Sequence, residues 1–145
     1  MHRYSPKGMT AATHVPPPHP TLKLLLVEDS RVLADRLVEL IDQTAEVELV
    51  AQVDNERDAS ALLRDQSVDV VILDLQLRQG TGFGVLKSLP RTGRRPRVIV
   101  LTNFDLPAYR REATELGADY FLDKSREYHR VPEILEALSA SARQS

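Results

Sequence analysis

The 145-residue chain contains no cysteine, which excludes disulfides, thiolate zinc sites and a cysteine nucleophile. No apolar run approaches the roughly 18 residues that a membrane span needs. Residues 1–20 also lack the continuous apolar segment of a signal peptide. Neither sign of charge dominates, and the formal net charge of −2 gives no general argument for nucleic-acid binding. We therefore expect a cytoplasmic protein with one domain, because a chain of this length can bury one core.

The first residues differ in composition from the rest of the chain. They hold five prolines and three histidines among few large apolar residues. Such a segment cannot bury enough apolar surface to offset the entropy of the chain. We expect a disordered, Pro-rich tail over residues 1–21 and one folded domain over residues 22–143. A Pro-rich docking peptide is the alternative interpretation of the tail.

Short apolar runs alternate with helical periodicities along the rest of the chain. Strands are expected at 22–27, 46–54, 69–74, 97–102 and 118–122. Helices are expected at 31–43, after Asn55, at 82–89, at 105–117 and from near Pro132, with Ser30, Asn55 and Asp105 as N-caps and Gly117 as a closing glycine. This alternation predicts an α/β fold, a doubly wound parallel sheet of five strands with helices on both faces.

Polar side chains stand where four of the five strands end. They are Glu28 and Asp29 after the first strand, Asp74 after the third, Thr102 on the fourth and Lys124 after the fifth. The carboxyl ends of parallel strands lie at one edge of a sheet, where ligands bind in this class of fold. A single acid there could also be a simple strand terminator, but the whole set predicts a shared pocket.

The chemistry of this set fits phosphoryl transfer. Three carboxylates repel one another, and a divalent cation such as Mg²⁺, which prefers oxygen ligands, removes that repulsion. Two carboxylates, the backbone carbonyl of Gln76 and waters would complete its coordination. Lys124 supplies a positive charge and Thr102 a hydroxyl donor. This equipment suits in-line attack by Asp74 on a phosphoryl group, which would form an aspartyl phosphate.

The same residues carry a resemblance to a known family. The set Glu28-Asp29, Leu73-Asp74, Leu101-Thr102 and Asp123-Lys124, with Gly117-Ala118 before the last strand, resembles the receiver domain of two-component response regulators. The resemblance covers about residues 22–143, and Gly117–Ser125 is similar to the receiver of LuxR-type regulators. It implies a flavodoxin-like sheet with strand order 2-1-3-4-5.

The resemblance implies a role for each residue of the set. The phosphoacceptor is Asp74. The Mg²⁺ ligands, among which Asp29 is more direct than Glu28, are Glu28, Asp29, Asp74 and the backbone carbonyl of Gln76. The phosphate-binding and switch residues are Thr102, Lys124 and the aromatic Phe121, although an aromatic at Phe121 is equally explained by the burial pattern of a strand.

The implied function is a stand-alone phosphorylation switch. A histidine kinase or histidine phosphotransfer protein donates the phosphoryl group to Asp74. The change then reaches the face formed by the fourth helix, the fifth strand and the fifth helix, which binds a downstream protein or a second copy. We expect no enzyme activity beyond slow self-catalysed phosphorylation and dephosphorylation. Neither a membrane nor nucleic acid is an expected partner.

Three positions depart from the family pattern. Arg78 and Ser125 stand where proline is usual, and Asn103 stands where a smaller residue is common. Ser125 leaves the isomer of its peptide bond with Lys124 open. Gln76 and Phe104 occupy positions that tune phosphoryl lifetime, which residue type alone does not predict.

Two other functions remain open at this point. A phosphatase of the haloacid-dehalogenase type also uses a strand-end aspartate, but it normally has a second acid where this chain has Gln76. The receiver could also belong to a DNA-binding transcriptional regulator, although the chain ends soon after the fifth helix. We interpret the basic residues in 87–97 as a solvated loop at the far edge of the sheet rather than a nucleic-acid contact.

Overall fold

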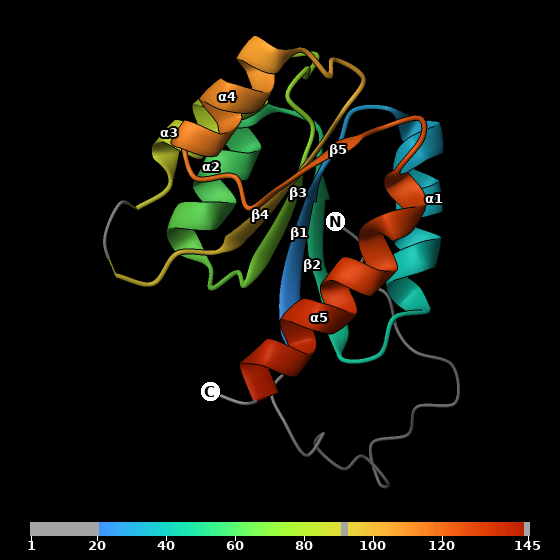
Figure 1. The fold of residues 1–145 in the computed structure, drawn as a ribbon. Coiled ribbons are helices and arrows are strands. Elements are labelled where there is room, and N and C mark those ends of the chain that lie inside the picture. The colour runs from blue at the N-terminus through green and yellow to red at the C-terminus, as the bar shows by residue number, and fades with distance from the viewer. Residues whose placement is uncertain (1–20, 91–92, 144–145) are drawn as a thin grey trace, which may run out of the picture.

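A computed structural model describes residues 21–90 and 93–143 of the chain. The expected Pro-rich tail at 1–21 therefore lies outside the described residues, apart from Thr21. Each strand and helix expected from the sequence is present (Figure 1). The strands are β1 (Leu22–Val27), β2 (Val47–Val53), β3 (Val70–Leu73), β4 (Arg97–Thr102) and β5 (Tyr120–Asp123). The helices are α1 (Arg31–Asp42), α2 (Glu56–Asp65), α3 (Gly82–Ser88), α4 (Pro107–Glu115) and α5 (Val131–Arg143), with a 3-10 turn at Tyr128–Arg130.

The strands form one parallel sheet in the order β2-β1-β3-β4-β5. Helices α1 and α5 cover one face, and α2, α3 and α4 cover the other (Figure 1). The predicted doubly wound architecture and its strand order are confirmed. The sheet separates two apolar cores because alternate residues of a strand point to opposite faces. In β1, Leu24 and Leu26 join the core under α1 and α5, whereas Leu25 and Val27 join the other.

Side-chain caps define where α1 and α2 begin. The Ser30 hydroxyl accepts a hydrogen bond from the backbone of Leu33, and the Asn55 side chain accepts one from Asp58, as predicted. The predicted cap at Asp105 is wrong. Pro107 is the first residue of α4, so the cap position falls on Leu106. The Asp105 carboxylate instead pairs with Arg110 at 2.8 Å.

The predicted closing glycine of α4 is confirmed. Gly117 has a φ of 105°, a conformation that glycine adopts without strain. The next residue, Ala118, donates its N–H to the carbonyl of Ala113 at 2.9 Å, which completes a C-terminal cap. The chain can therefore turn sharply from α4 into β5.

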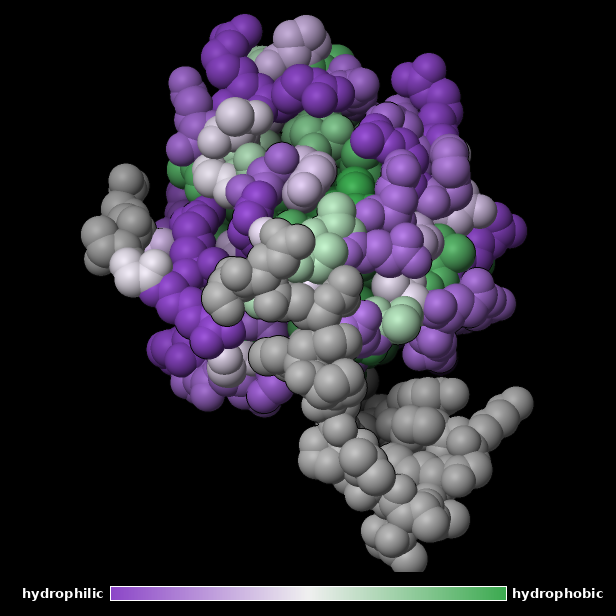
Figure 2. Space-filling model, turned by 60° about the horizontal axis from the view of Figure 1, so that its bottom comes forward, coloured by the Kyte–Doolittle hydropathy of each residue, from purple (hydrophilic) through white to green (hydrophobic). Residues whose placement is uncertain are grey.

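The amino ends of the strands lie at the edge of the sheet that faces forward in Figure 2, where hydrophilic side chains surround smaller apolar areas. Arg94, Arg95 and Arg97 belong to this edge, at the start of β4 and far from the acidic strand ends, as expected. They make specific contacts: Arg94 pairs with Asp69, and Arg97 with Asp119 at 3.2 Å. Arg95 donates to the carbonyl of Leu116 at 2.8 Å.

Within residues 21–90 and 93–143, none of the helices has the length and apolar character to cross a membrane.

Candidate functional site

Three acids meet at the carboxyl edge of the sheet. Glu28 and Asp29 directly follow β1, and Asp74 directly follows β3, the strand paired with β1. A carboxylate oxygen from each acid lies within 4.8 Å of one from each of the others. Glu28 and Asp74 are each only 2% exposed, whereas Asp29 is partly exposed. The topology thus brings together acids that are 45 residues apart in the chain.

Lys124 reaches the acids from the far side of β4. Its Nζ lies 2.6 Å from Oδ2 of Asp74 and 3.1 Å from Oε2 of Glu28. Lys124 follows β5, which is two strands from β3 and three from β1. Neighbouring strands are about 4.8 Å apart, so only a long side chain can span this distance. Lys124 is thus paired with the two buried acids, and Asp29 lies beside them.

Backbone N–H groups fix the orientation of the two buried acids. The N–H of Ser30 donates to Oε2 of Glu28 at 2.8 Å. The N–H of Gln76 donates to Oδ1 of Asp74 at 3.0 Å. Asp74 therefore has one oxygen held by the loop after β3 and the other by Lys124. These contacts fix the orientation of its carboxylate beside Asp29.

Burial governs the ionisation of the cluster. Desolvation raises the pKa of Glu28 above its usual range, and the nearby charge of Asp74 adds to this. Desolvation also raises the pKa of Asp74, although Lys124 and the N–H of Gln76 act in the opposite direction. Burial alone would lower the pKa of Lys124, but its hydrogen bond and attraction to Asp74 and Glu28 together raise it. The excess of negative charge and the all-oxygen donor set fit a hard divalent cation.

Thr102 lies at the same edge as the last residue of β4, and it is fully buried. Its hydroxyl accepts a hydrogen bond from the N–H of Phe104 at 3.2 Å. Its carbonyl accepts the N–H of Lys124 at 2.8 Å, so the ends of β4 and β5 are joined directly beside the acids. Ser125 continues this link, because its hydroxyl donates to the side chain of Asn103 at 3.0 Å.

The positions that depart from the family pattern also have defined surroundings. Every peptide bond among the described residues is trans, including the bond from Lys124 to Ser125. Ser125 and Asn103 bind each other across the two loops that follow β4 and β5. The loops after β4 and β5 are therefore connected to each other beside Lys124.

Phe121 is half-buried on β5, and its ring has a partner that we did not predict from the sequence. The guanidinium carbon of Arg110 lies 4.5 Å from the ring centroid. Arg110 also pairs with Asp105, so one side chain connects α4, β5 and the loop after Thr102. No local sequence spacing signals this contact, because the residues come from three elements.

Gly82 is a further residue of the site that we did not single out. A Cβ atom at this position would overlap the backbone carbonyl oxygen of Asp74. Its N–H donates to the carbonyl of Leu75 at 3.0 Å. Glycine thus lets the start of α3 pack against the backbone of Asp74. The glycines of the loop after Asp74 were the only signal for this contact in the sequence.

A buried acid after β3, an acidic pair after β1 and a lysine after β5 are the arrangement of a phosphoacceptor domain. The sequence model of the response regulator receiver domain family matches residues 24–136 of this chain. The chain therefore belongs to the response regulator receiver family, as predicted. Phosphorylation of such domains is the general switch of two-component signalling, in which they interact with histidine kinases and downstream effectors.

Curated relatives agree with this assignment. The chain is 30% identical to the sensory transduction protein LytT of Bacillus cereus over 115 residues, which cover 79% of this chain and 46% of LytT. It is 43% identical to the transcriptional regulatory protein CpxR of Klebsiella pneumoniae over 102 residues, which cover 70% of this chain and 42% of CpxR. The chain thus spans about half the length of the curated relatives that it matches.

Solved structures show the same fold. A DNA-binding response regulator of the LuxR family from Staphylococcus aureus superposes with a TM-score of 0.73 at 29% identity, over 81% of this chain and 98% of that chain. The response regulatory domain of mrkE from Klebsiella pneumoniae gives a TM-score of 0.76 at 24% identity, over 86% of this chain and 100% of that chain. Receiver domains are regulatory phosphoacceptors, so the family favours a switch over the phosphatase alternative.

Proposed function

We propose that Asp74 accepts a phosphoryl group from a phosphohistidine of a histidine kinase or a histidine phosphotransfer protein. The convergence of Asp74 with Lys124, Glu28 and Asp29 at one edge of the sheet is the observation that carries this proposal. In the reaction, a carboxylate oxygen of Asp74 bonds to phosphorus as the bond from phosphorus to the imidazole nitrogen breaks. The imidazole leaves with the electron pair and takes up a proton.

Side chains around Asp74 have separate parts in this transfer. The N–H of Gln76 holds Oδ1 of Asp74, which leaves Oδ2 on the side of Lys124. Lys124, already 2.6 Å from Asp74, offsets negative charge on the phosphoryl oxygens. Thr102, on the adjacent strand end, offers its hydroxyl as a neutral donor to the same group. These assignments give Gln76, Lys124 and Thr102 separate roles at one reacting centre.

Glu28, Asp29, Asp74 and the backbone carbonyl of Gln76 are the groups that would hold Mg²⁺. When bound, the cation offsets charge on the phosphoryl oxygens that approach the acidic cluster. Burial, and after it the neighbouring acids, raises the pKa of Glu28 and of Asp74, so a bound cation would lower the cost of keeping both acids ionised. Asp29, the partly exposed member, lies at the entrance to this set.

The output of the switch is a change in the face formed by α4, β5 and α5. The added charge at Asp74 attracts the ends of β4 and β5, which are joined by the hydrogen bond from Lys124 to Thr102. The loop after Thr102 carries Asp105, and through Arg110 this loop is tied to the ring of Phe121. Movement of the loop therefore changes the surface around Phe121, where a downstream protein or a second copy binds.

Control of transcription is a second candidate for the output. It is favoured because the relative CpxR is named a transcriptional regulatory protein, and the similar structure from Staphylococcus aureus is named a DNA-binding response regulator. The receiver would then regulate a DNA-binding region rather than contact DNA itself. A protein containing such a region would bind its operator more tightly after phosphorylation, whereas equal binding before and after would contradict this output.

Incorporation of phosphate tests the phosphoacceptor. The protein is incubated with labelled acetyl phosphate and Mg²⁺, and acid-stable and base-labile label is measured. The Asp74→Asn variant should take up no label, whereas the Asp65→Asn variant, changed at an exposed acid of α2, should behave as the wild type. Unchanged labelling of Asp74→Asn would show that another residue is the acceptor.

A further inference from the structure

The loop between β3 and α3 positions backbone groups around Asp74. Within it, Gln76 donates its N–H to the Asp74 carboxylate at 3.0 Å. Gln76 is paired with Thr81 in an antiparallel bridge, and Gly82 donates to the carbonyl of Leu75 at 3.0 Å. The place of Gln76 therefore depends on how firmly Thr81 is held.

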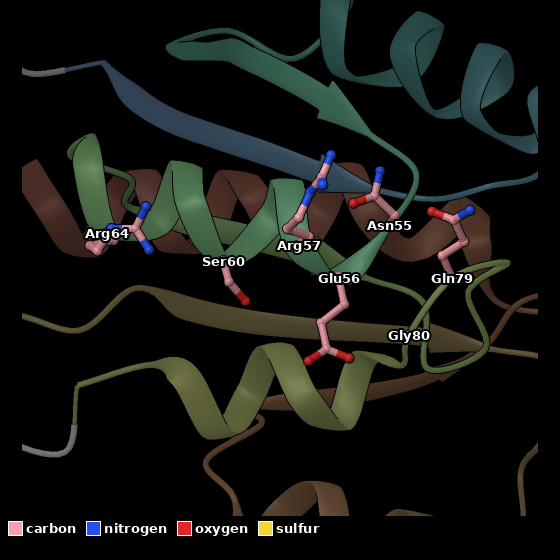
Figure 3. A pocket seen from close by; sticks show the side chains of 7 residues that line it. All are labelled: Asn55, Glu56, Arg57, Ser60, Arg64, Gln79 and Gly80. Carbon is pink, nitrogen blue, oxygen red and sulfur yellow. The ribbon is translucent and has the colours of Figure 1, made fainter.

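Glu56, the first residue of α2, holds Thr81 from outside the loop. Its Oε1 accepts the N–H of Thr81 at 2.9 Å, across 25 residues of sequence. Its own N–H donates to the carbonyl of Gln79 at 3.1 Å, so Glu56 binds the loop at two points. In Figure 3 the Glu56 side chain extends from α2 toward α3, beside a surface cavity of about 530 Å³ that Ser60 and Arg64 also line.

Two glycines leave the space that this carboxylate occupies. A Cβ atom at Gly80 would lie 2.6 Å from Oε1 of Glu56, and a Cβ atom at Gly84 would overlap the same carboxylate. Gly80 also has a φ of 81°, which disfavours other residues. The carboxylate thus lies between the loop and the first turn of α3, in space that the two glycines leave free. This fit goes beyond a single hydrogen bond at the surface.

We propose that Glu56 is a positioning residue for the phosphoacceptor site. It contacts neither Asp74 nor the proposed ligands directly; it acts through Thr81 and Gln76. Without its carboxylate, Thr81 loses the acceptor of its N–H, and the bridge that holds the N–H and carbonyl of Gln76 beside Asp74 is loosened. The inference rests on the proposed function, because that function requires Gln76 at this place.

The test compares Glu56→Ala, Glu56→Gln and the matched control Glu39→Ala, which removes an exposed acid of α1. Binding of Mg²⁺ and of beryllofluoride to the protein is measured by titration. Glu56→Ala should weaken Mg²⁺ binding by about tenfold, the size typical of groups that orient metal ligands. Glu56→Gln keeps an acceptor oxygen and should recover most of this loss. Glu39→Ala should match the wild type.

Amide hydrogen exchange provides a second measurement. In Glu56→Ala, exchange at Thr81 and Gln76 should accelerate while exchange in β1 and β3 is unchanged. Faster exchange throughout the domain, with no rescue by Glu56→Gln, would show a general structural role and overturn the proposal. Wild-type affinities in Glu56→Ala would overturn it as well.

Phosphate uptake separates this inference from the proposed function. If the wild type takes up phosphate on Asp74 and Glu56→Ala requires a higher Mg²⁺ concentration for half-maximal uptake, both stand. If the wild type takes up phosphate and Glu56→Ala is indistinguishable from it, only the role of Glu56 falls. If the wild type takes up no phosphate at Asp74, the proposed function falls and the role of Glu56 falls with it.

Discussion

The guanidinium of Arg110 lies over the ring of Phe121, with its central carbon 4.5 Å from the ring centroid. The same guanidinium pairs with Asp105 at 2.8 Å. One face of Phe121 is thereby covered by a charged group that is anchored to the loop after β4. A cation over an aromatic ring contributes about 0.5–1 kcal/mol at exposed sites. This contact stabilises the present position of the ring against any position in which the ring has left Arg110.

Removing the Arg110 guanidinium from the ring of Phe121 should favour the phosphorylated form of the domain. In the Arg110→Ala variant the ring of Phe121 loses its contact with the guanidinium. Titration with beryllofluoride should then show binding about threefold tighter than in the wild type, which corresponds to the modest energy of the contact. Arg110→Lys, which keeps a cation, should lie between the variant and the wild type. Arg111→Ala, at the adjacent exposed position, is the control. Weaker binding by Arg110→Ala would contradict a restraining role for the contact.

Neutralising Asp74 should stabilise the metal-free protein. Its carboxylate is 2% exposed and shares its surroundings with Glu28 and Asp29, so the charged form is costly to bury. Lys124 keeps Glu28 as a partner at 3.1 Å when Asp74 becomes asparagine. Urea unfolding in a chelator should show a gain of about 1 kcal/mol in the free energy of unfolding for Asp74→Asn. A loss would mean that the ion pair with Lys124 outweighs desolvation.

Mg²⁺ should stabilise the protein through the acidic cluster. A ligand present at about 100 times its dissociation constant raises the free energy of unfolding by about 2.7 kcal/mol. The midpoint of thermal unfolding should therefore rise by several degrees when Mg²⁺ is added to the wild type. Asp29→Asn should abolish most of this rise, whereas Asp35→Asn, at an exposed acid of α1, should retain it. Equal stabilisation of both variants would place the cation elsewhere.

Acid should loosen the turn between β5 and α5. Hydrogen bonds from the N–H groups of Arg126 and Ser125 hold the pKa of Asp123 below its usual value. The N–H of Asp123 and the neighbouring Arg130 lower the pKa of Glu127. A lowered pKa in the folded state means that the stabilisation is present above the usual acid range and is lost as the pH falls through the folded values.

Amide exchange across the pH range checks this expectation. Protection of Asp123 and Arg126, corrected for the intrinsic rates, should fall at pH values below about 4, while β1 stays protected. In Glu127→Ala the protection at Asp123 should already be low near neutral pH. A turn that remains equally protected at every pH would contradict the role assigned to these carboxylates.

Much of the fold follows from local patterns. Apolar runs that end in polar residues located the strands, and their alternation with helices required parallel pairing. Parallel pairing then placed Glu28, Asp74 and Lys124 at one edge, because the ends of such strands converge. The strand order itself came from the family resemblance. The roles of these residues in phosphoryl transfer stay predictions until the experiments above are done.

Other features depend on three-dimensional packing that no spacing encodes. The contacts of Glu56 with Thr81 and of Arg110 with Phe121 join elements whose separation is set only once the helices have packed. At Asp105 the sequence predicted a contact that the structure does not contain, because aspartate is a residue type that often caps helices. Pro107 moved the start of α4 by one residue, and the acid was left to pair with Arg110. Sequence patterns therefore indicate which groups meet at the strand ends better than they indicate lateral contacts.

The close packing of Gly82 against the carbonyl of Asp74 bears on how this family evolves. Any larger residue there must push the backbone of the acceptor aside, even though the acceptor side chain itself is retained. A homologue that keeps the aspartate but has a larger residue at this position should therefore not function as a phosphoacceptor. The sequence at this one position would identify such a homologue before its signalling is measured.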